Sequence, residues 1–287
     1  MKSFKQSAFS RFFTRFPKLL LAGLMYSISL AVFTGIFFLI SRLTGFNNVI
    51  IWGLGIIPST PFLAGLVMVI RKYAIEKLDV PIIRTFFTAV KENLKTFILH
   101  GVITYVIVAC SFFAILYYYT LSTDDPVFGS VLTLYLLFTA LLLVMMFYVP
   151  IMTITYELRT WDIYKNSFLL IFGKILRNLI AFIAVIIVTG MALLALIFSD
   201  GAMFWITTGI IVILYPLIFC YIVNSIIAKG LQESVGPFVG INSDIELTEA
   251  DMEHEKEIVA NTDSTSDYIF VNGKMVKNTA KNKDEDK

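Results

Sequence analysis

Few side chains in this sequence could carry out chemistry, and most of them lie at the edges of long apolar runs. The histidines are His100 and His254 and the cysteines are Cys110 and Cys220, so a histidine-rich metal centre and a disulfide framework are both excluded. No GxxxxGK[ST], HExxH or GxSxG motif is present. A membrane-embedded enzyme would have to rest on His100 or Glu157. We therefore expect no enzymatic activity, no metal and no cofactor.

Prolines inside the apolar runs are the strongest candidates for a binding path. A proline removes a backbone N–H and frees a carbonyl one turn earlier, which can line a substrate path if several such helices face one cavity. The hydroxyl groups of residues next to these prolines, and an asparagine amide near the end of the last run, could add polar ligands. The candidate path consists of Pro58, Ser59, Thr60, Pro61, Pro150, Pro216 and Asn224. The alternative is that the prolines only kink helices that pack together, which is common in membrane-spanning helices.

The elements that hold these residues follow from composition. The sequence is 57% hydrophobic and only 15% charged, and its mean hydropathy is +0.80, which is typical of an integral membrane protein. Six runs lack Asp, Glu, Lys and Arg, and each is long enough to cross a hydrocarbon core about 30 Å thick. They are residues 19–40, 49–70, 97–119, 127–153, 179–198 and 203–227. The sequence predicts an all-α membrane protein with six transmembrane helices, the first of them a retained anchor.

Orientation is predicted from the basic residues between these runs. Fifteen Lys and Arg residues lie in the N-terminal segment and in the second and fourth connections, whereas the other connections hold only Arg42. Because basic loops stay on the cytoplasmic side, we expect a multi-pass protein of the cytoplasmic membrane with both termini in the cytoplasm.

Two of the basic connections have helical periodicity. Residues 79–97 and 162–178 each place apolar side chains on one face and basic ones on another, with Asp79 and Asp162 as candidate N-caps. Such helices would lie along the inner leaflet, where anionic lipids attract basic side chains. The predicted lipid contacts are Arg71, Lys72, Arg84, Lys91, Lys95, Lys174 and Arg177. No nucleic-acid partner is predicted.

The basic helices recur along the chain, which indicates an internal repeat. The segment RFFT at 11–14 resembles RTFFT at 84–88, and each predicted unit has an amphipathic helix, a plain span and a proline-kinked span. Three parallel repeats result. The predicted domains are a basic amphipathic segment at 1–18, a six-helix domain at 19–231 and a tail at 232–287.

The tail differs from the rest in charge. It holds 13 acidic and six basic residues, and we expect it to be mostly disordered in the cytoplasm. One stretch, SDYIFVNGKMVKN, alternates apolar residues around Asn272 and Gly273, which predicts a β-hairpin.

The stretch IPSTPFLAGLVMVIRKYAIEKLDVPIIRTFFTAVKENLKTFILHG resembles the signature region of the YesL-like family of bacterial integral membrane proteins, a domain of unknown function. The matching positions are Pro58, Pro61, Ala64, Arg71, Lys72, Phe86, Lys91, Glu92, Asn93 and Lys95. The resemblance extends over about residues 19–227 and leaves out the acidic tail. It implies a protein of Gram-positive bacteria without an established activity, encoded near sugar-uptake and polysaccharide-utilisation systems.

Two functions from different classes remain. The first is an accessory or scaffolding component linked to the uptake of a solute such as a carbohydrate, which engages other membrane-transport proteins through its cytoplasmic surface. The second is a permease with a path along the proline-broken helices. The GxxxG at 236–240 follows the last span and contains Pro237, so it does not predict helix dimerisation, and the oligomeric state is left open.

Overall fold

The computed structural model describes residues 8–46, 48–76, 78, 80–123, 125–234, 268–271 and 274–277. Most of the predicted acidic tail therefore lies outside the described residues, as does Asp79. The predicted boundary at residue 231 is three residues early, because the last helix continues to Ser234.

Six helices of the described chain are long and apolar enough to cross a membrane, which confirms the predicted spans. Five of them are single helices. The second span, Val49–Tyr73, combines a short helix, a longer helix and a π-helical turn. In chain order the elements are α1 (Ala8–Thr44), α2 (Val49–Gly53), α3 (Ile56–Val69), η1 (Ile70–Ile75), α5 (Leu94–Ser122), α6 (Pro126–Thr155), α8 (Ile175–Ile197) and α9 (Gly201–Ser234).

The two predicted amphipathic helices are present but shorter than expected. They are α4 (Ile82–Glu92) and α7 (Thr160–Gly173). Each is followed by one residue that leaves the helical conformation, Asn93 with φ −102° and ψ 10° and Lys174 with φ −129° and ψ 42°. The predictions of 79–97 and 162–178 were therefore too long, because apolar periodicity continues across a break that turns the chain into the next span.

The predicted cap of the second amphipathic helix is also wrong. Its N-cap is Arg159, so Asp162 stands in the first turn. A carboxylate there still interacts favourably with the positive end of the helix dipole.

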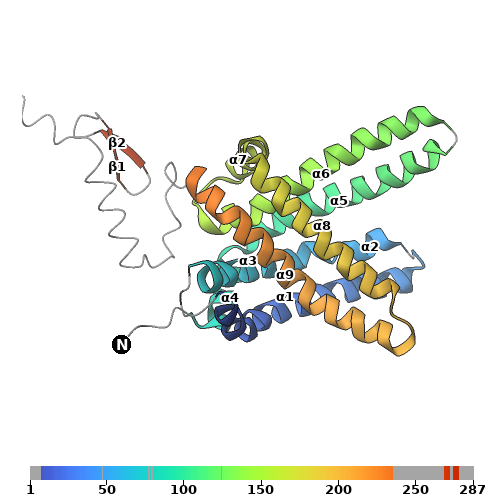
Figure 1. The fold of residues 1–287 in the computed structure, drawn as a ribbon, viewed down its shortest axis with the longest axis horizontal. Coiled ribbons are helices and arrows are strands. Elements are labelled where there is room, and N and C mark those ends of the chain that lie inside the picture. The colour runs from blue at the N-terminus through green and yellow to red at the C-terminus, as the bar shows by residue number, and fades with distance from the viewer. Residues whose placement is uncertain are drawn as a thin grey trace, which may run out of the picture.

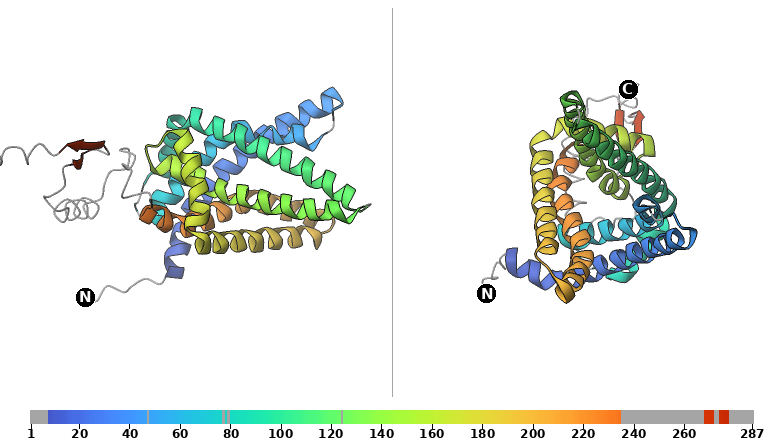
Figure 2. Two further views of the ribbon diagram at one scale, coloured as in Figure 1. Left: turned by 90° about the horizontal axis from the view of Figure 1, so that it is seen from above. Right: turned by 90° about the vertical axis from the view of Figure 1, so that its right-hand side faces the viewer.

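The spans are arranged as three pairs, α1 with α3, α5 with α6, and α8 with α9. Seen along the helices, the pairs form the sides of a roughly triangular outline (Figure 2, right). The helices α3, α6 and α9, which carry the prolines of the predicted path, contact one another. In addition, α1 packs against α9 and α5 packs against α3. The sequence repeat itself stays a prediction.

The core lies at the end of the bundle that carries α4 and α7, called here the α4/α7 end (Figure 1). From there the pairs diverge toward the opposite end. Buried apolar residues gather in the halves of α3, α6 and α9 nearest α4 and α7, including Leu66, Met152 and Ile227. Toward the opposite end the helices expose large apolar side chains such as Phe113 and Leu137, as expected of surfaces that face lipid.

Two glycines allow close contacts between elements. A Cβ on Gly55, the residue before α3, would lie 2.5 Å from the backbone nitrogen of Thr34 in α1. A Cβ on Gly65 in α3 would lie 2.8 Å from the ring of Phe86, which is how α4 packs tightly on α3. Larger residues at these two positions would force the helices apart.

The predicted hairpin is confirmed in the backbone. Strands β1 (Tyr268–Val271) and β2 (Lys274–Lys277) are antiparallel, and Val271 pairs with Lys274.

Candidate functional site at the α4/α7 end

The hydroxyls of the predicted proline path are used within their own helix. Ser59 and Thr60 both donate to the carbonyl oxygen of Ile56, at 2.8 and 2.7 Å. Thr60 also faces α5, because a Cβ on Gly101 would lie 2.5 Å from its Oγ1. These two hydroxyls therefore serve the packing of α3.

The prolines occupy different environments. Pro61 is buried, and the other three prolines are half-buried: Pro58, Pro150 and Pro216. Each lies inside or at the start of α3, α6 or α9, which contact one another. Their role in transport stays a prediction.

Asn224 is the residue of the predicted path whose side chain has a polar atom without a hydrogen-bond partner among the described residues. Its side chain is 2% exposed, and Nδ2 donates to the carbonyl of Cys220 one turn earlier, at 2.7 Å. Its Oδ1 has no hydrogen-bond partner among the described residues. A buried acceptor without a donor is costly, so this position fits a water or a polar ligand.

A second group of polar residues surrounds His100, near the start of α5. His100 is 3% exposed, and its Nδ1 lies 2.8 Å from the hydroxyl of Tyr164 in α7. Its Nε2 lies 3.0 Å from Oγ1 of Thr153 in α6. The imidazole therefore links two spans to the amphipathic helix α7.

The donor and acceptor in each of these two hydrogen bonds follow from the single hydroxyl proton of Thr153. Thr153 has one hydroxyl proton, which it donates to the carbonyl of Val149 at 2.7 Å. Its oxygen must then accept the N–H of His100 Nε2, and Nδ1 accepts from Tyr164. This arrangement requires a protonated phenol at Tyr164, and burial raises the pKa of that phenol to about 12.

Asn178 holds α6, α7 and α8 together. Its Oδ1 accepts from the hydroxyl of Tyr148 in α6 at 2.5 Å, while Nδ2 donates to the carbonyls of Leu170 and Ile171, both at 2.9 Å. The carbonyl of Leu170 also accepts from the backbone N–H of Lys174. That of Ile171 lies in the last turn of α7, where a helix leaves acceptors unsatisfied. Asn178 thus caps α7 from the first turn of the following span.

Arg71 and Glu76 form an ion pair beside the π-helical turn. The Nε of Arg71 lies 2.6 Å from Oε1 of Glu76, and the two side chains are 13% and 25% exposed. The positive charge of Arg71 also lies near Tyr156, whose pKa is raised by burial and partly lowered by that charge. A π-helical turn is uncommon and often marks a functional position.

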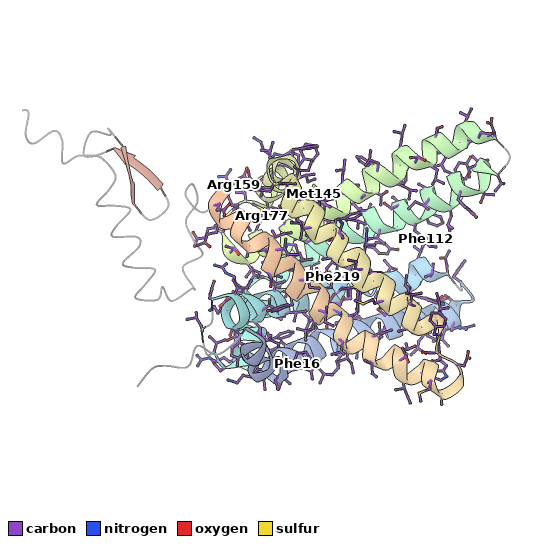
Figure 3. All side chains as sticks on the ribbon, in the orientation of Figure 1. Phe16, Phe112, Met145, Arg159, Arg177 and Phe219 are labelled. Carbon is purple, nitrogen blue, oxygen red and sulfur yellow. The ribbon has the colours of Figure 1, made fainter. Side chains whose placement is uncertain are left out.

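Lys174 and Arg177 are paired as well. Glu233, near the end of α9, accepts from Lys174 Nζ at 3.1 Å and from Arg177 Nη2 at 2.9 Å. The arginine lies over Gly230, where a Cβ would come 2.7 Å from Nη1. Figure 3 places Arg177 at the α4/α7 end.

The predicted lipid contacts thus divide into two sets. Arg71, Lys174 and Arg177 have carboxylate partners within the chain. Lys72 is half-buried, and three residues are exposed on or just after α4: Arg84, Lys91 and Lys95. Sequence periodicity does not predict Glu233 as a partner, because it lies more than 50 residues from Lys174 and Arg177.

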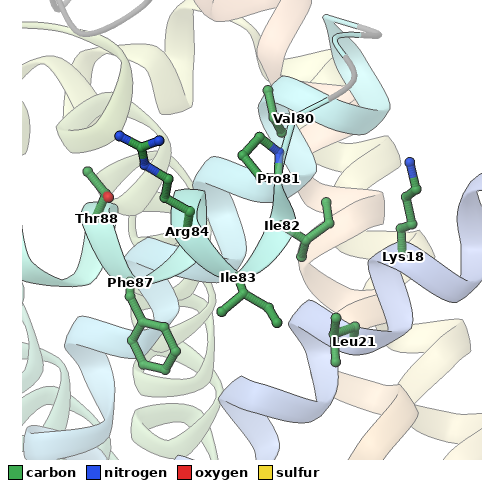
Figure 4. Close-up of a pocket in the computed structure, with 9 residues that line it drawn as sticks. All are labelled: Lys18, Leu21, Val80, Pro81, Ile82, Ile83, Arg84, Phe87 and Thr88. Atoms are coloured by element: carbon green, nitrogen blue, oxygen red, sulfur yellow. The ribbon is translucent and has the colours of Figure 1, made fainter.

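The amphipathic helices bury only part of their apolar faces. In α4, Phe86 and Val90 are buried, whereas Ile83 and Phe87 are 57% and 52% exposed. The same division occurs in α7, where Phe168 and Phe172 are exposed, with their ring centroids 5.6 Å apart. Beside the exposed part of α4 runs a groove between α4 and α1 that Lys18 and Arg84 help to line (Figure 4).

The residues on which an enzyme would rest do not form a reactive pair. Both nitrogens of His100 are engaged in hydrogen bonds, and Glu157 is exposed in the segment that follows α6. Among the described residues, His, Cys, Asp and Glu side chains form no group of three that could bind a metal ion.

Comparison with known proteins gives a family but no close relative. No curated protein and no solved structure matches the chain. A family described as "Protein of unknown function, DUF624" matches residues 30–115, from the middle of α1 to most of α5. That range includes the Arg71–Glu76 ion pair and His100, but not the partners of His100, which are Thr153 in α6 and Tyr164 in α7. The resemblance to the YesL-like family is therefore confirmed, over a shorter range than expected: residues 30–115 are similar to the DUF624 domain of that family.

Proposed function

We propose that this chain is a non-enzymatic protein of the cytoplasmic membrane that acts as an accessory or scaffolding component of solute uptake. In this proposal the α4/α7 end faces the cytoplasm and presents a fixed surface to another membrane-transport protein. The orientation rests on the basic residues that this end carries.

One observation carries the proposal, which is that the buried polar side chains at this end bond the amphipathic helices to the spans. His100 and Asn178 each connect three elements. Both ring nitrogens of His100 and both polar atoms of the Asn178 amide have hydrogen-bond partners. Such a network fixes a surface and leaves these groups unavailable for a reaction. The exposed side chains beside it, among them Lys91, Lys95 and Phe172, would meet the partner.

Co-purification tests the proposal. The tagged protein, extracted from native membranes in mild detergent after brief cross-linking, should recover a partner in a fixed ratio. The variant Lys91→Glu/Lys95→Glu should recover less of it, because the reversed charges lie on the proposed surface. Asp200→Asn is the matched control, since it changes an exposed charge at the opposite end and should recover the same amount. Recovery of no stoichiometric partner would count against the proposal.

A permease is the second candidate, and the unpaired Oδ1 of Asn224 favours it. This buried acceptor lies on α9, which also carries Pro216 and contacts the other two proline helices. In reconstituted vesicles, flux of labelled sugars should then be lost in Asn224→Leu and in alanine variants of Pro58, Pro150 and Pro216. Vesicles that show no flux with the intact protein would remove this candidate.

A further inference from the structure

A groove of about 830 Å³ lies between α1 and the first turns of α4, apart from the polar networks described above (Figure 4). Lys18 and Leu21 of α1 line one side, and Ile83, Arg84 and Phe87 of α4 line the other. The groove is open to the surroundings of the protein, so a ligand could enter from the membrane.

The groove carries positive charge. Two of its nine lining residues, Lys18 and Arg84, are basic, and none is acidic. The ammonium of Lys18 is placed 5.1 Å from the centroid of the Tyr73 ring. Pro81, the N-cap of α4, makes no side-chain capping bond, and the first intrahelical bond runs from the nitrogen of Thr85 to the oxygen of Pro81. The preceding N–H groups therefore add a partial positive charge to that of the two cations.

The groove is also apolar at its floor and sides. Leu21, Ile83 and Phe87 remain 39%, 57% and 52% exposed within the chain. Leu21 lies three residues deeper in the candidate span than Lys18, or about 4.5 Å along the helix. A ligand in contact with both residues therefore reaches from the level of the headgroups into the hydrocarbon.

We propose that this groove binds one anionic phospholipid. Its phosphate lies between Lys18 and Arg84, and an acyl chain follows Leu21, Ile83 and Phe87. A soluble acidic peptide would match the charges but would not cover apolar side chains at membrane depth. The inference goes beyond the accessory function proposed above and does not depend on it.

Lipid titration of the purified full-length protein tests the proposal. In mild detergent, native mass spectrometry would count the phosphatidylglycerol or phosphatidylcholine molecules retained at each lipid concentration. We expect one phosphatidylglycerol to bind at least fivefold more tightly than phosphatidylcholine. Lys18→Gln and Arg84→Gln should each weaken it by about fivefold, the usual contribution of one basic residue near anionic lipid.

Two further variants separate this site from general attraction to the surface. Lys165→Gln removes an exposed charge of α7 outside the groove and should leave the affinity unchanged. Leu21→Trp, or Ile83→Trp if the first fails to fold, should fill the groove and weaken binding while both charges remain. The unfolding temperature of each variant checks that it is folded.

Three results would overturn the proposal. Equal loss of affinity in Lys165→Gln and Arg84→Gln would indicate only non-specific attraction. Equal affinity for the two lipids would exclude recognition of the anionic headgroup. Displacement of phosphatidylglycerol by inorganic phosphate at comparable concentration would mean that the acyl chain contributes nothing and that the site binds free phosphate.

Discussion

His100 is a structural link whose two ring nitrogens have different roles. Nε2 donates to Thr153 in α6, and Nδ1 accepts from Tyr164 in α7. A histidine at a membrane boundary is often mobile and reaches toward the headgroups. Here the ring is 3% exposed and contacts Phe97 edge to face, with the centroids 5.6 Å apart. Its contribution should therefore be seen in stability.

Removing either partner of the His100–Tyr164 hydrogen bond should destabilise the protein, and the two losses of unfolding free energy should not be additive. We expect His100→Ala and Tyr164→Phe each to lower the free energy of unfolding, because each leaves a buried polar group unpaired at a cost of about 1–3 kcal/mol. The double variant should lose less than the sum, by about 0.5–3 kcal/mol. Unfolding in mixed micelles with increasing dodecyl sulfate measures these values.

The matched control for this cycle is Tyr215→Phe. The Tyr215 hydroxyl lies 2.9 Å from Thr189 Oγ1, and it shares no partner with His100. Its effect should add to that of His100→Ala within about 0.5 kcal/mol. Full additivity of His100→Ala with Tyr164→Phe would contradict the assigned bond.

At the scale of elements, the junction of α1 with the start of α3 allows no extra atom. A Cβ on Gly55 would meet three backbone atoms of Thr34 and Phe33 at 2.5 to 2.8 Å, and backbone cannot move aside as a flexible side chain can. We expect Gly55→Ala to lower the free energy of unfolding by about 1–3 kcal/mol. The same dodecyl sulfate titration would measure the change.

Gly190→Ala is the comparison for this prediction. Nothing lies within 4 Å of a Cβ at Gly190 in α8, so alanine should leave stability unchanged or raise it by up to about 1 kcal/mol through helix propensity. If the two alanine variants were equally stable, the close approach of α1 to Gly55 would be refuted.

The end of α9 depends on side chains from α8. Glu233 accepts from both Lys174 and Arg177, which attaches the last turn of α9 to the start of α8. We expect Glu233→Gln to speed hydrogen exchange of the backbone amides in that turn, with little change in the core, because the charged acceptor is lost. Gln232→Ala, at an exposed neighbouring position, should exchange as the parent protein does. Unchanged exchange in Glu233→Gln would show that the pairs do not hold the helix.

Sequence periodicity predicted that the helices exist more accurately than it predicted where they begin and end. The apolar residues of α4 and α5 share one helical spacing, so the pattern 79–97 looked continuous although Asn93 interrupts it. Hydrophobic spacing reports which side of a helix avoids water but does not separate a face buried in protein from one exposed to lipid. Phe86 and Phe87 are adjacent apolar residues of this pattern, but only Phe86 is buried, against Gly65 and Phe62 of α3.

At the scale of the whole molecule, the composition predicted six spans because each run lacks charged residues, and that requirement does not depend on tertiary contacts. The candidate site could not be predicted in the same way. Its bonds join residues far apart in sequence, such as His100 with Tyr164 and Tyr148 with Asn178. His100 carried a local signal, as an ionisable residue within the predicted apolar run 97–119, whereas Asn178 directly follows Arg177 and lies outside such a run.

The orientation of the bundle yields the last prediction, since the basic α4/α7 end should face the cytoplasm. In a background of Cys110→Ala and Cys220→Ala, single cysteines would be placed at exposed positions of both ends. Thr123→Cys and Asp200→Cys should react with a membrane-impermeant maleimide in intact cells, because they lie at the turns of the opposite end.

Lys91→Cys and Trp161→Cys, on α4 and α7, should react only after the membrane is opened. Each removes no more than one basic residue, so the excess of positive charge that orients the bundle is kept. The reverse labelling pattern would contradict the proposed orientation, and with it the cytoplasmic partner. Reaction of only one of Thr123→Cys and Asp200→Cys in intact cells would contradict the six-span topology, because two intervening spans return the chain to the same side.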